Sequence, residues 1–205
     1  MDNRRASIPL NLDNSAEILD VYAQIDADTA VFQSETGLHC PPGCGKCCDN
    51  PHIESTPLEM LPMAVELVQR GEHLAWLERI ELASSNTCVC YKRSPTVSGN
   101  GSCEMYAWRP SLCRLFGFAA TQDKAGNPVL ASCSHHKAVM PDTLAAAQAA
   151  VAKGLSITQF GHWQARIANI DPSWGYQRMP INQALQVALE RVSLILAYWS
   201  ATASS

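Results

Sequence analysis

The cysteines constrain the possible folds of this chain more than any other feature, because they all fall in one part of it. Four thiols occur within residues 40–48, in the segment Cys-Pro-Pro-Gly-Cys-Gly-Lys-Cys-Cys. The remaining five follow further along the chain: Cys88, Cys90, Cys103, Cys113 and Cys133. No cysteine precedes residue 40 or follows residue 133. The fold must therefore accommodate nine sulfur atoms in less than half of the chain.

Composition indicates what these thiols are not needed for. With 205 residues, 47% of them hydrophobic and 17% charged, the chain can bury an ordinary apolar core and does not need disulfides to replace one. A disulfide framework would also leave one of nine thiols unpaired. Arg4 and Arg5 are followed by no continuous apolar segment, so we expect neither a secretory signal nor a membrane span. We predict a reducing cytoplasm, where clustered thiols are usually metal ligands or redox groups.

Charge argues against a nucleic-acid partner. The formal net charge is −4, and the lysines and arginines are spread thinly without a basic block. Phosphate binding needs such a block. We therefore expect a metal ion or metal cluster as the ligand, and no nucleic acid or membrane as partner.

The loop around the first four cysteines has the composition of a metal knuckle. Pro41 and Pro42 stiffen its backbone, and Gly43 and Gly45 permit turns that other residues resist. Free cysteines that only fill a core are usually scattered, which makes simple packing the weaker interpretation. Adjacent cysteines project in different directions, so two sites, or one cluster with a spare thiol, are both open.

Apolar periodicity predicts a mainly α fold with a small β-hairpin. The predicted helices cover residues 14–37, 56–71, 74–82, 142–153, 156–168 and 181–199. A short helix should follow Pro110 and expose Cys113, and strands at 116–121 and 129–133 should form the hairpin. His135 and His136 follow Cys133 and could substitute for a thiolate, but we expect them to be solvent-exposed neighbours. The predicted organisation is a flexible arm (1–13), a cysteine-cluster domain (14–140) and a helical extension packed on it (141–205).

Two motifs together resemble a known family. The first is Gly-Cys-Gly-Lys-Cys-Cys at 43–48, and the second, at 103–114, has the form Cys-x-x-Tyr-x-x-Arg-Pro-x-x-Cys-Arg, with a further Cys133. Over about residues 38–136 the chain is similar to the YkgJ-type cysteine-cluster proteins, which carry a zinc- or iron-chelating CxxCxxCC domain. The first motif departs from the family pattern, because three residues instead of two separate Cys40 from Cys44. The resemblance therefore extends more directly to Cys44 than to Cys40.

The resemblance implies metal binding through clustered thiolates and no known reaction. The ligands we expect are Cys44, Cys47, Cys48, Cys103, Cys113 and Cys133, followed by Cys40 and Cys90. Cys88 and Cys90 are so close in sequence that either can be the ligand. We expect Arg109 and Arg114 to stabilise the site by charge and by hydrogen bonds to carbonyls, and Tyr106 to pack over it.

Three functions remain open from the residues alone. The first is a protein that chelates zinc or an iron–sulfur cluster, since soft thiolates suit both and adjacent cysteines suit a polynuclear iron cluster better than a simple zinc finger. The second is a thiol or iron–sulfur redox enzyme or switch, because Cys44-Gly-Lys-Cys47 has dithiol spacing. The third is a helical interaction module stapled by structural zinc, with Trp163, Trp174, Trp199 and the C-terminal helix as its partner surface. No catalytic signature is present to assign an activity.

Overall fold

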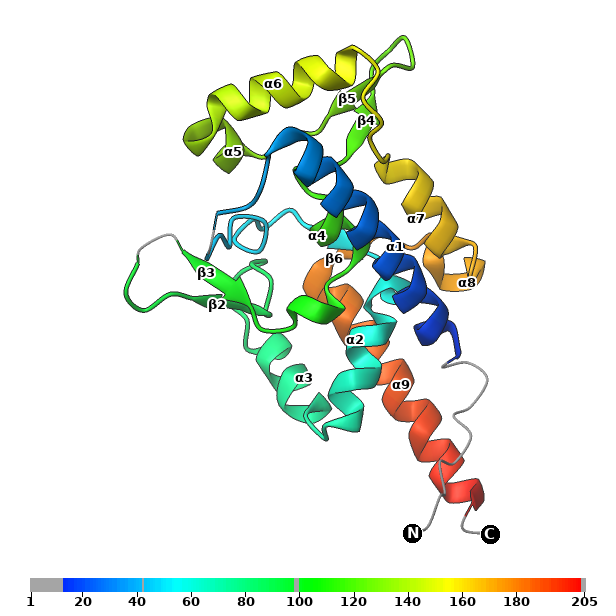
Figure 1. The fold of residues 1–205 in the computed structure, drawn as a ribbon. Helices are drawn as coiled ribbons and strands as arrows, with labels where there is room; N and C mark the ends of the chain where they lie inside the picture. Colours follow the sequence, from blue (N-terminus) through cyan, green and yellow to red (C-terminus); the bar gives the residue numbers. More distant parts are fainter. Residues whose placement is uncertain (1–12, 42, 98–99, 204–205) are drawn as a thin grey trace, which may run out of the picture.

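The computed structural model describes residues 13–41, 43–97 and 100–203, and it is mainly α-helical with small antiparallel two-stranded sheets (Figure 1). This confirms the predicted fold class. The predicted arm, residues 1–13, lies outside the described residues except for Asp13, which begins the first helix. The proposed division of the chain at residue 140 stays a prediction.

The helices and strands follow one another in a mixed order. The helices are α1 (Asp13–Thr36), α2 (Pro57–Gln69), α3 (His73–Glu81), α4 (Ser111–Leu115), α5 (Ser134–Val139), α6 (Pro141–Ala152), α7 (Phe160–Ala168), α8 (Pro172–Gly175) and α9 (Ile181–Ala203), with a 3₁₀ turn, η2, at Tyr106–Trp108. The strands are β1 (Glu54–Ser55), β2 (Tyr91–Arg93), β3 (Gly101–Cys103), β4 (Ala120–Gln122), β5 (Pro128–Leu130) and β6 (Met179–Pro180). They pair as β1 with β6, β2 with β3 and β4 with β5.

The first helix begins and ends as its sequence predicts. Its apolar residues Ile18, Tyr22, Ile25 and Phe32 are all buried, which places one face of α1 against the core. Gly37 adopts a positive φ of 69° and its amide bonds to a carbonyl of the last turn, so the chain leaves the helix toward the cysteine loop.

The second helix is fixed at its start by a capping box. The Thr56 side chain accepts a hydrogen bond from the Glu59 amide, and the Glu59 carboxylate accepts one from the Thr56 amide. Pro62 does not end the helix, which continues to Gln69. Glu59 is buried and also accepts a hydrogen bond from the Ser111 hydroxyl, so α2 and α4 are joined at this carboxylate.

The last helix lies along α2 (Figure 1). Its apolar residues Ile181, Leu185, Leu189 and Val192 are fully buried in the main core. Trp163 and Trp174 belong to the same core, so they cannot form the partner surface that the interaction-module hypothesis required. The Trp199 side chain lies outside the described part of the structure.

The hairpins differ partly from prediction. The β4–β5 hairpin turns at Asp123–Asn127 as predicted, but its strands are short because Phe116 still caps α4 and Ser134 already begins α5. Helix α7 starts at Phe160 and not at 156, since the preceding residues bond to β4 through the Ala120 amide and the Thr158 carbonyl, 2.8 Å apart. The β2–β3 hairpin, which contains Cys103, was not predicted.

Two apolar cores meet at the centre of the molecule. The larger core is formed mainly by α1, α2, α7 and α9, and the smaller one lies between the end of α1, the β4–β5 hairpin and α6. Met60 and Met63 of the first core and Phe118 of the second line one shared cavity. Across the described residues, no helix has the length and apolar character that crossing a bilayer requires.

Candidate metal-binding site

The cavity between the two cores collects all nine cysteines. Its volume is about 490 Å³. The sulfur-bearing residues come from the loop after α1, the segment before β2, strand β3, helix α4 and the residue that precedes α5: Cys40, Cys44, Cys47, Cys48, Cys88, Cys90, Cys103, Cys113 and Cys133. The eight cysteines predicted as ligands are thus brought together, and Cys88 joins them. Their binding of metal stays a prediction.

Tight turns shape the cluster loop of residues 40–48. The Cys44 amide donates to the Pro41 carbonyl at 3.1 Å, and the Cys48 amide donates to the Gly45 carbonyl at 3.0 Å. Gly43 has a φ of 71°, a conformation that glycine adopts without strain. These turns direct both Cys47 and Cys48 to the cavity, although the two are adjacent in sequence.

The β2–β3 hairpin holds the cluster loop in place. The Gly101 amide donates to the Gly43 carbonyl at 2.9 Å, and the Cys88 amide donates to the Cys48 carbonyl at 3.2 Å. The Tyr91 ring lies between Gly45 and Gly101, so closely that a Cβ atom at either glycine would stand 2.2 Å from it. The two glycines therefore allow the ring to pack between loop and strand. In the sequence, Gly45 and Gly101 are the signal that could have indicated close packing at these two positions.

Five of the thiols form a continuous chain of sulfur contacts. Cys103 is its centre, with hydrogen bonds to the Cys48 and Cys90 side chains, and the chain extends from these to Cys47 and Cys88. Because two thiols donate to Cys103, its pKa is lowered to about 3. The same bonds raise the pKa values of Cys48 and Cys90. Cys103 is therefore the first of these five thiols to lose its proton. We call the five linked thiols together with Cys113 the inner group.

The remaining thiols lie in different surroundings. Burial raises the pKa of Cys113, and the charges of Cys47, Cys88 and Cys103 add to that effect. Partial burial raises the pKa of Cys40 to about 11, and the charges of Cys44, Cys47 and Cys133 add to this effect in that order. Cys40, Cys44 and Cys133 have no part in the sulfur contact chain of the inner group, and we call these three the outer group.

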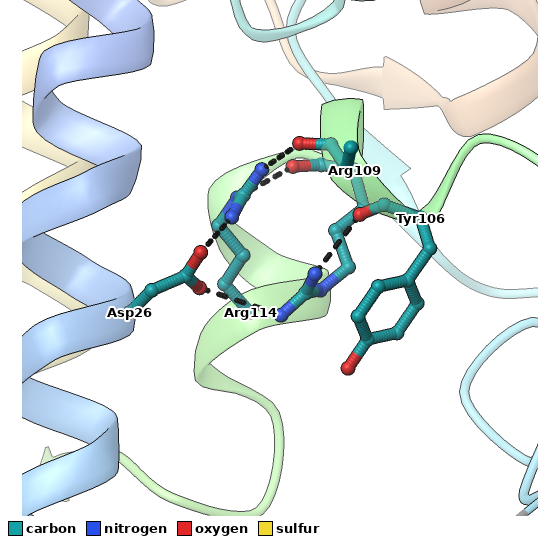
Figure 2. Close-up of polar contacts among 5 residues, drawn as sticks. Asp26, Tyr106, Arg109 and Arg114 are labelled. Atoms are coloured by element: carbon teal, nitrogen blue, oxygen red, sulfur yellow. Dashed lines mark hydrogen bonds and ion pairs between the residues drawn. The ribbon is translucent and has the colours of Figure 1, made fainter.

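Two arginines and one carboxylate border the cavity (Figure 2). Asp26 of α1 pairs with both Arg109 and Arg114, and the Arg114 side chain is only 3% exposed. Arg114 also donates to the carbonyls of Ala107 and Arg109. Since two guanidinium groups share one carboxylate, an excess positive charge remains beside the thiols, and positive charge favours thiolates over thiols. Asp26 was not identified from the sequence, because it lies in α1, far from the motifs.

Tyr106 lies at the cavity, and its packing over a bound metal stays a prediction. It lines the cavity, yet 62% of it is exposed. Its ring lies against the Arg109 guanidinium, 3.8 Å from the carbon atom to the ring centre, and its carbonyl accepts a hydrogen bond from the same side chain (Figure 2). Tyr106 therefore orients Arg109 and leaves the mouth of the cavity partly open.

His136 corrects the expectation that both histidines before α6 are exposed. It is only 1% exposed, and its ring contacts that of Phe118 at a tilt of 58°. One of its ring nitrogens, Nε2, lies 4.0 Å from the Cys40 sulfur. The sequence contains a signal for a histidine near the thiols, because His136 follows Cys133 by three residues at the start of α5.

The donor atoms present suit a soft metal. Thiolates select zinc, copper(I) and iron–sulfur centres over hard cations, and the apolar walls formed by Met60, Met63 and Phe118 limit competing water. Among the residues that the structure describes, no group of three or more His, Cys, Asp or Glu side chains is already arranged around one metal position. Metal binding would therefore draw the cysteine side chains inward from the cavity wall.

Comparison with known proteins points to the same segment. Residues 39–145, just over half of the chain, match the family model CxxCxxCC, described as "Putative zinc- or iron-chelating domain". The matched region contains all nine cysteines, and it includes α4, α5 and the β2–β3 and β4–β5 hairpins. Neither a curated protein nor a solved structure matches the chain.

Proposed function

Because the chain belongs to the CxxCxxCC family of zinc- or iron-chelating domains, we propose that it binds metal through the thiolates lining the central cavity. The observation that carries this proposal is that nine cysteines from well-separated segments line a single cavity of about 490 Å³. Metal ligation explains this convergence better than core packing does, since thiols that only pack have no reason to face one space.

The inner group is the best candidate for the main centre. A mononuclear zinc site needs only four ligands, whereas the inner group alone supplies more sulfur atoms than that. Linked thiols around a sizeable cavity fit a polynuclear centre, which favours an iron–sulfur cluster over one zinc ion. In this proposal Cys47, Cys48, Cys103 and Cys113 are ligands, and Cys88 and Cys90 compete for the same centre.

The arginines support the proposal through charge. A centre held by four thiolates has a net negative charge, and burying it needs a compensating positive group. Arg109 and Arg114 provide one more positive charge than Asp26 neutralises. Arg114 is held by carbonyl hydrogen bonds in addition to the ion pair, so this charge stays in place when the centre is empty.

A thiol switch is the second candidate, and one observation favours it. Cys103 has a pKa lowered to about 3 and touches two neighbouring thiols. When no metal is bound, its thiolate can therefore form a disulfide with one of them by exchange with a small-molecule disulfide, which takes up the two electrons and leaves as two thiols. The Cys44-x-x-Cys47 pair is less suited to thioredoxin-like chemistry, because a helix and a loop precede it instead of a strand. In a reducing cytoplasm, the compartment we expect, the metal-bound form would predominate.

Elemental analysis and an absorption spectrum test the main proposal. The protein should be purified without oxygen and without a metal-binding tag, and then assayed for zinc, iron and acid-labile sulfide. Stoichiometric iron with sulfide and a brown colour would support the polynuclear centre, and stoichiometric zinc without colour would support a structural centre. Protein that holds neither metal, and takes up neither after reduction of its thiols, would overturn the proposal.

Two matched cysteine variants then locate the centre. Cys103→Ala removes the middle of the sulfur contact chain, whereas Cys88→Ala removes one end of it. We expect Cys103→Ala to lose most of its metal and Cys88→Ala to retain most of it. Equal metal contents in the two variants would contradict this ranking.

A further inference from the structure

The outer group has a fourth potential ligand that is not a cysteine. His136 lies in the first turn of α5, three residues after Cys133, which occupies the N-cap position of that helix. Residues three apart on a helix lie on the same side, so Cys133 and His136 face the same region. Cys40 and Cys44 come from the cluster loop, and the sulfurs near Cys40 are those of Cys44, Cys47 and Cys133.

The spacing of these four residues has the pattern of a zinc site. Cys40-x₃-Cys44 is within the range of a short cysteine pair, and Cys133-x₂-His136 supplies a second short pair. Three cysteines and one histidine make up a known ligand set for tetrahedral zinc. Neither pair overlaps the sulfur contact chain of the inner group.

The geometry around His136 is already close to that of a shared metal. Its Nε2 lies 4.0 Å from the Cys40 sulfur. Bond lengths of about 2.3 Å to sulfur and about 2.0 Å to nitrogen place two tetrahedral ligand atoms roughly 3.6 Å apart. A metal between Cys40 and His136 would thus require only a small approach of the two side chains, together with rotation of Cys44 and Cys133.

The histidine is buried without a full set of partners. It is 1% exposed, and its second ring nitrogen, Nδ1, has no hydrogen-bond partner among the described residues. An imidazole that served only to fill the core would be expected to satisfy both nitrogens. Gly117 makes room for it, because a Cβ atom there would stand 2.9 Å from the ring and 3.4 Å from the Cys133 Cβ atom.

We propose that Cys40, Cys44, Cys133 and His136 form a second metal site, separate from the inner group and selective for a tetrahedral divalent ion such as zinc. This site deepens the proposed function, since it divides the cysteines of the cavity between two centres. It also assigns a role to Cys40, which lies outside the usual spacing of the first family motif. The exposed position of Cys40 gives an ion access to this site from solvent.

Cobalt(II) titration of the metal-free full chain tests the second site. Cobalt reports its ligands through absorption, because each bound thiolate adds charge-transfer intensity. The variants are His136→Ala, His136→Cys and the neighbouring control His135→Ala. Far-UV circular dichroism of each metal-free variant establishes whether it is folded.

We expect the wild-type chain to bind one more equivalent of cobalt(II) than His136→Ala does. His135→Ala should bind as much cobalt(II) as the wild type. Loss of a residue that only hydrogen-bonds to a metal ligand weakens metal affinity by about 10–100-fold. Loss of the ligand His136 itself should therefore weaken the cobalt affinity of the second site by more than about 100-fold. His136→Cys should restore the equivalent with stronger sulfur charge-transfer absorption.

The outcomes separate this inference from the proposed function. If His136→Ala is folded and binds as much cobalt as the wild type, the second site is wrong while metal binding by the inner group stands. If His136→Ala does not fold, His136→Cys decides, and an unchanged absorption spectrum in that variant overturns the inference. A wild-type chain that binds no cobalt overturns the second site, and only one that also holds neither zinc nor iron contradicts the proposed function itself.

Discussion

At the residue scale, charge and close packing decide how the thiols are held. Arg114 is nearly inaccessible to solvent, and its guanidinium satisfies Asp26 and two backbone carbonyls (Figure 2). Gly45 and Gly101 are equally specific, since each leaves space for the Tyr91 ring. These residues do not face a metal as ligands, yet each fixes a segment that carries cysteines.

Two replacements of Arg114 distinguish the effect of its positive charge from the effect of its hydrogen bonds. Arg114→Met removes one of the two ion pairs of Asp26 and leaves the pair with Arg109. Because Asp26 is partly exposed to water, we expect a loss of only about 2 kcal/mol in unfolding free energy. It should also weaken metal binding by about tenfold through loss of the positive charge. Arg114→Lys should destabilise the fold similarly while keeping most of the metal affinity. Denaturant unfolding and metal competition measure the two effects, and equal losses of affinity in both variants would contradict the role of charge.

Gly45→Ala should disturb the cluster loop. The new Cβ atom would overlap the Tyr91 ring, which cannot move freely because Gly101 contacts its other side. We expect a loss of about 2 kcal/mol in unfolding free energy and reduced metal content. Gly161→Ala is the matched control, since nothing lies within 4 Å of its added methyl group. Similar stabilities for the two variants would show that the ring does not limit this position.

At the element scale, the site depends on how α1, α2 and α4 are joined. The Tyr22 hydroxyl of α1 donates to the Glu59 carbonyl of α2 at 2.6 Å, and the Glu59 carboxylate accepts from Ser111 of α4. Arg114 of α4 returns to α1 through Asp26. This closed set of contacts fixes the position of Cys113 relative to the loop that follows α1.

Tyr22→Phe should change both stability and its pH dependence. The lost hydrogen bond should cost about 1 kcal/mol at neutral pH. Burial, followed by the charge of Glu59, raises the pKa of Tyr22. A raised pKa gives stability that is fully present below the unfolded value of about 10 and is lost as pH rises above it, because only the unfolded chain then ionises the phenol. Thermal unfolding between pH 8 and about 11 should show a shallower loss in Tyr22→Phe, and parallel curves would contradict the assignment.

At the scale of the whole molecule, residues of both apolar cores line the cysteine cavity. The larger core contains Cys48, Cys88 and Cys90, and Phe118 of the smaller core lines the same cavity. A metal bound there would link segments from α1 to α5. Metal and fold should therefore be coupled thermodynamically.

Removal of metal should lower the stability of the entire chain. A ligand present at 1,000 times its dissociation constant stabilises the folded state by about 4 kcal/mol. For a chain of this size that corresponds to a Tm difference of roughly 10 °C. Calorimetry before and after treatment with a chelator and a reductant, and again after metal is restored, measures the difference. An unchanged Tm after complete metal removal would show that the metal is not linked to folding.

The sequence by itself determined the local structure and the chemistry of this protein. The capping box at Thr56 and the apolar stripe of α1 predicted helices, and the clustered cysteines predicted a thiolate site, because each depends on residues close together in the chain. Tertiary structure decided which distant groups meet. The pairing of Asp26 with Arg114, the Tyr91 ring between two glycines and the burial of His136 beside Cys40 all join segments far apart in sequence. Hydrophobic periodicity and short motifs do not identify the partners in such contacts, because each contact forms only when segments distant in sequence pack together.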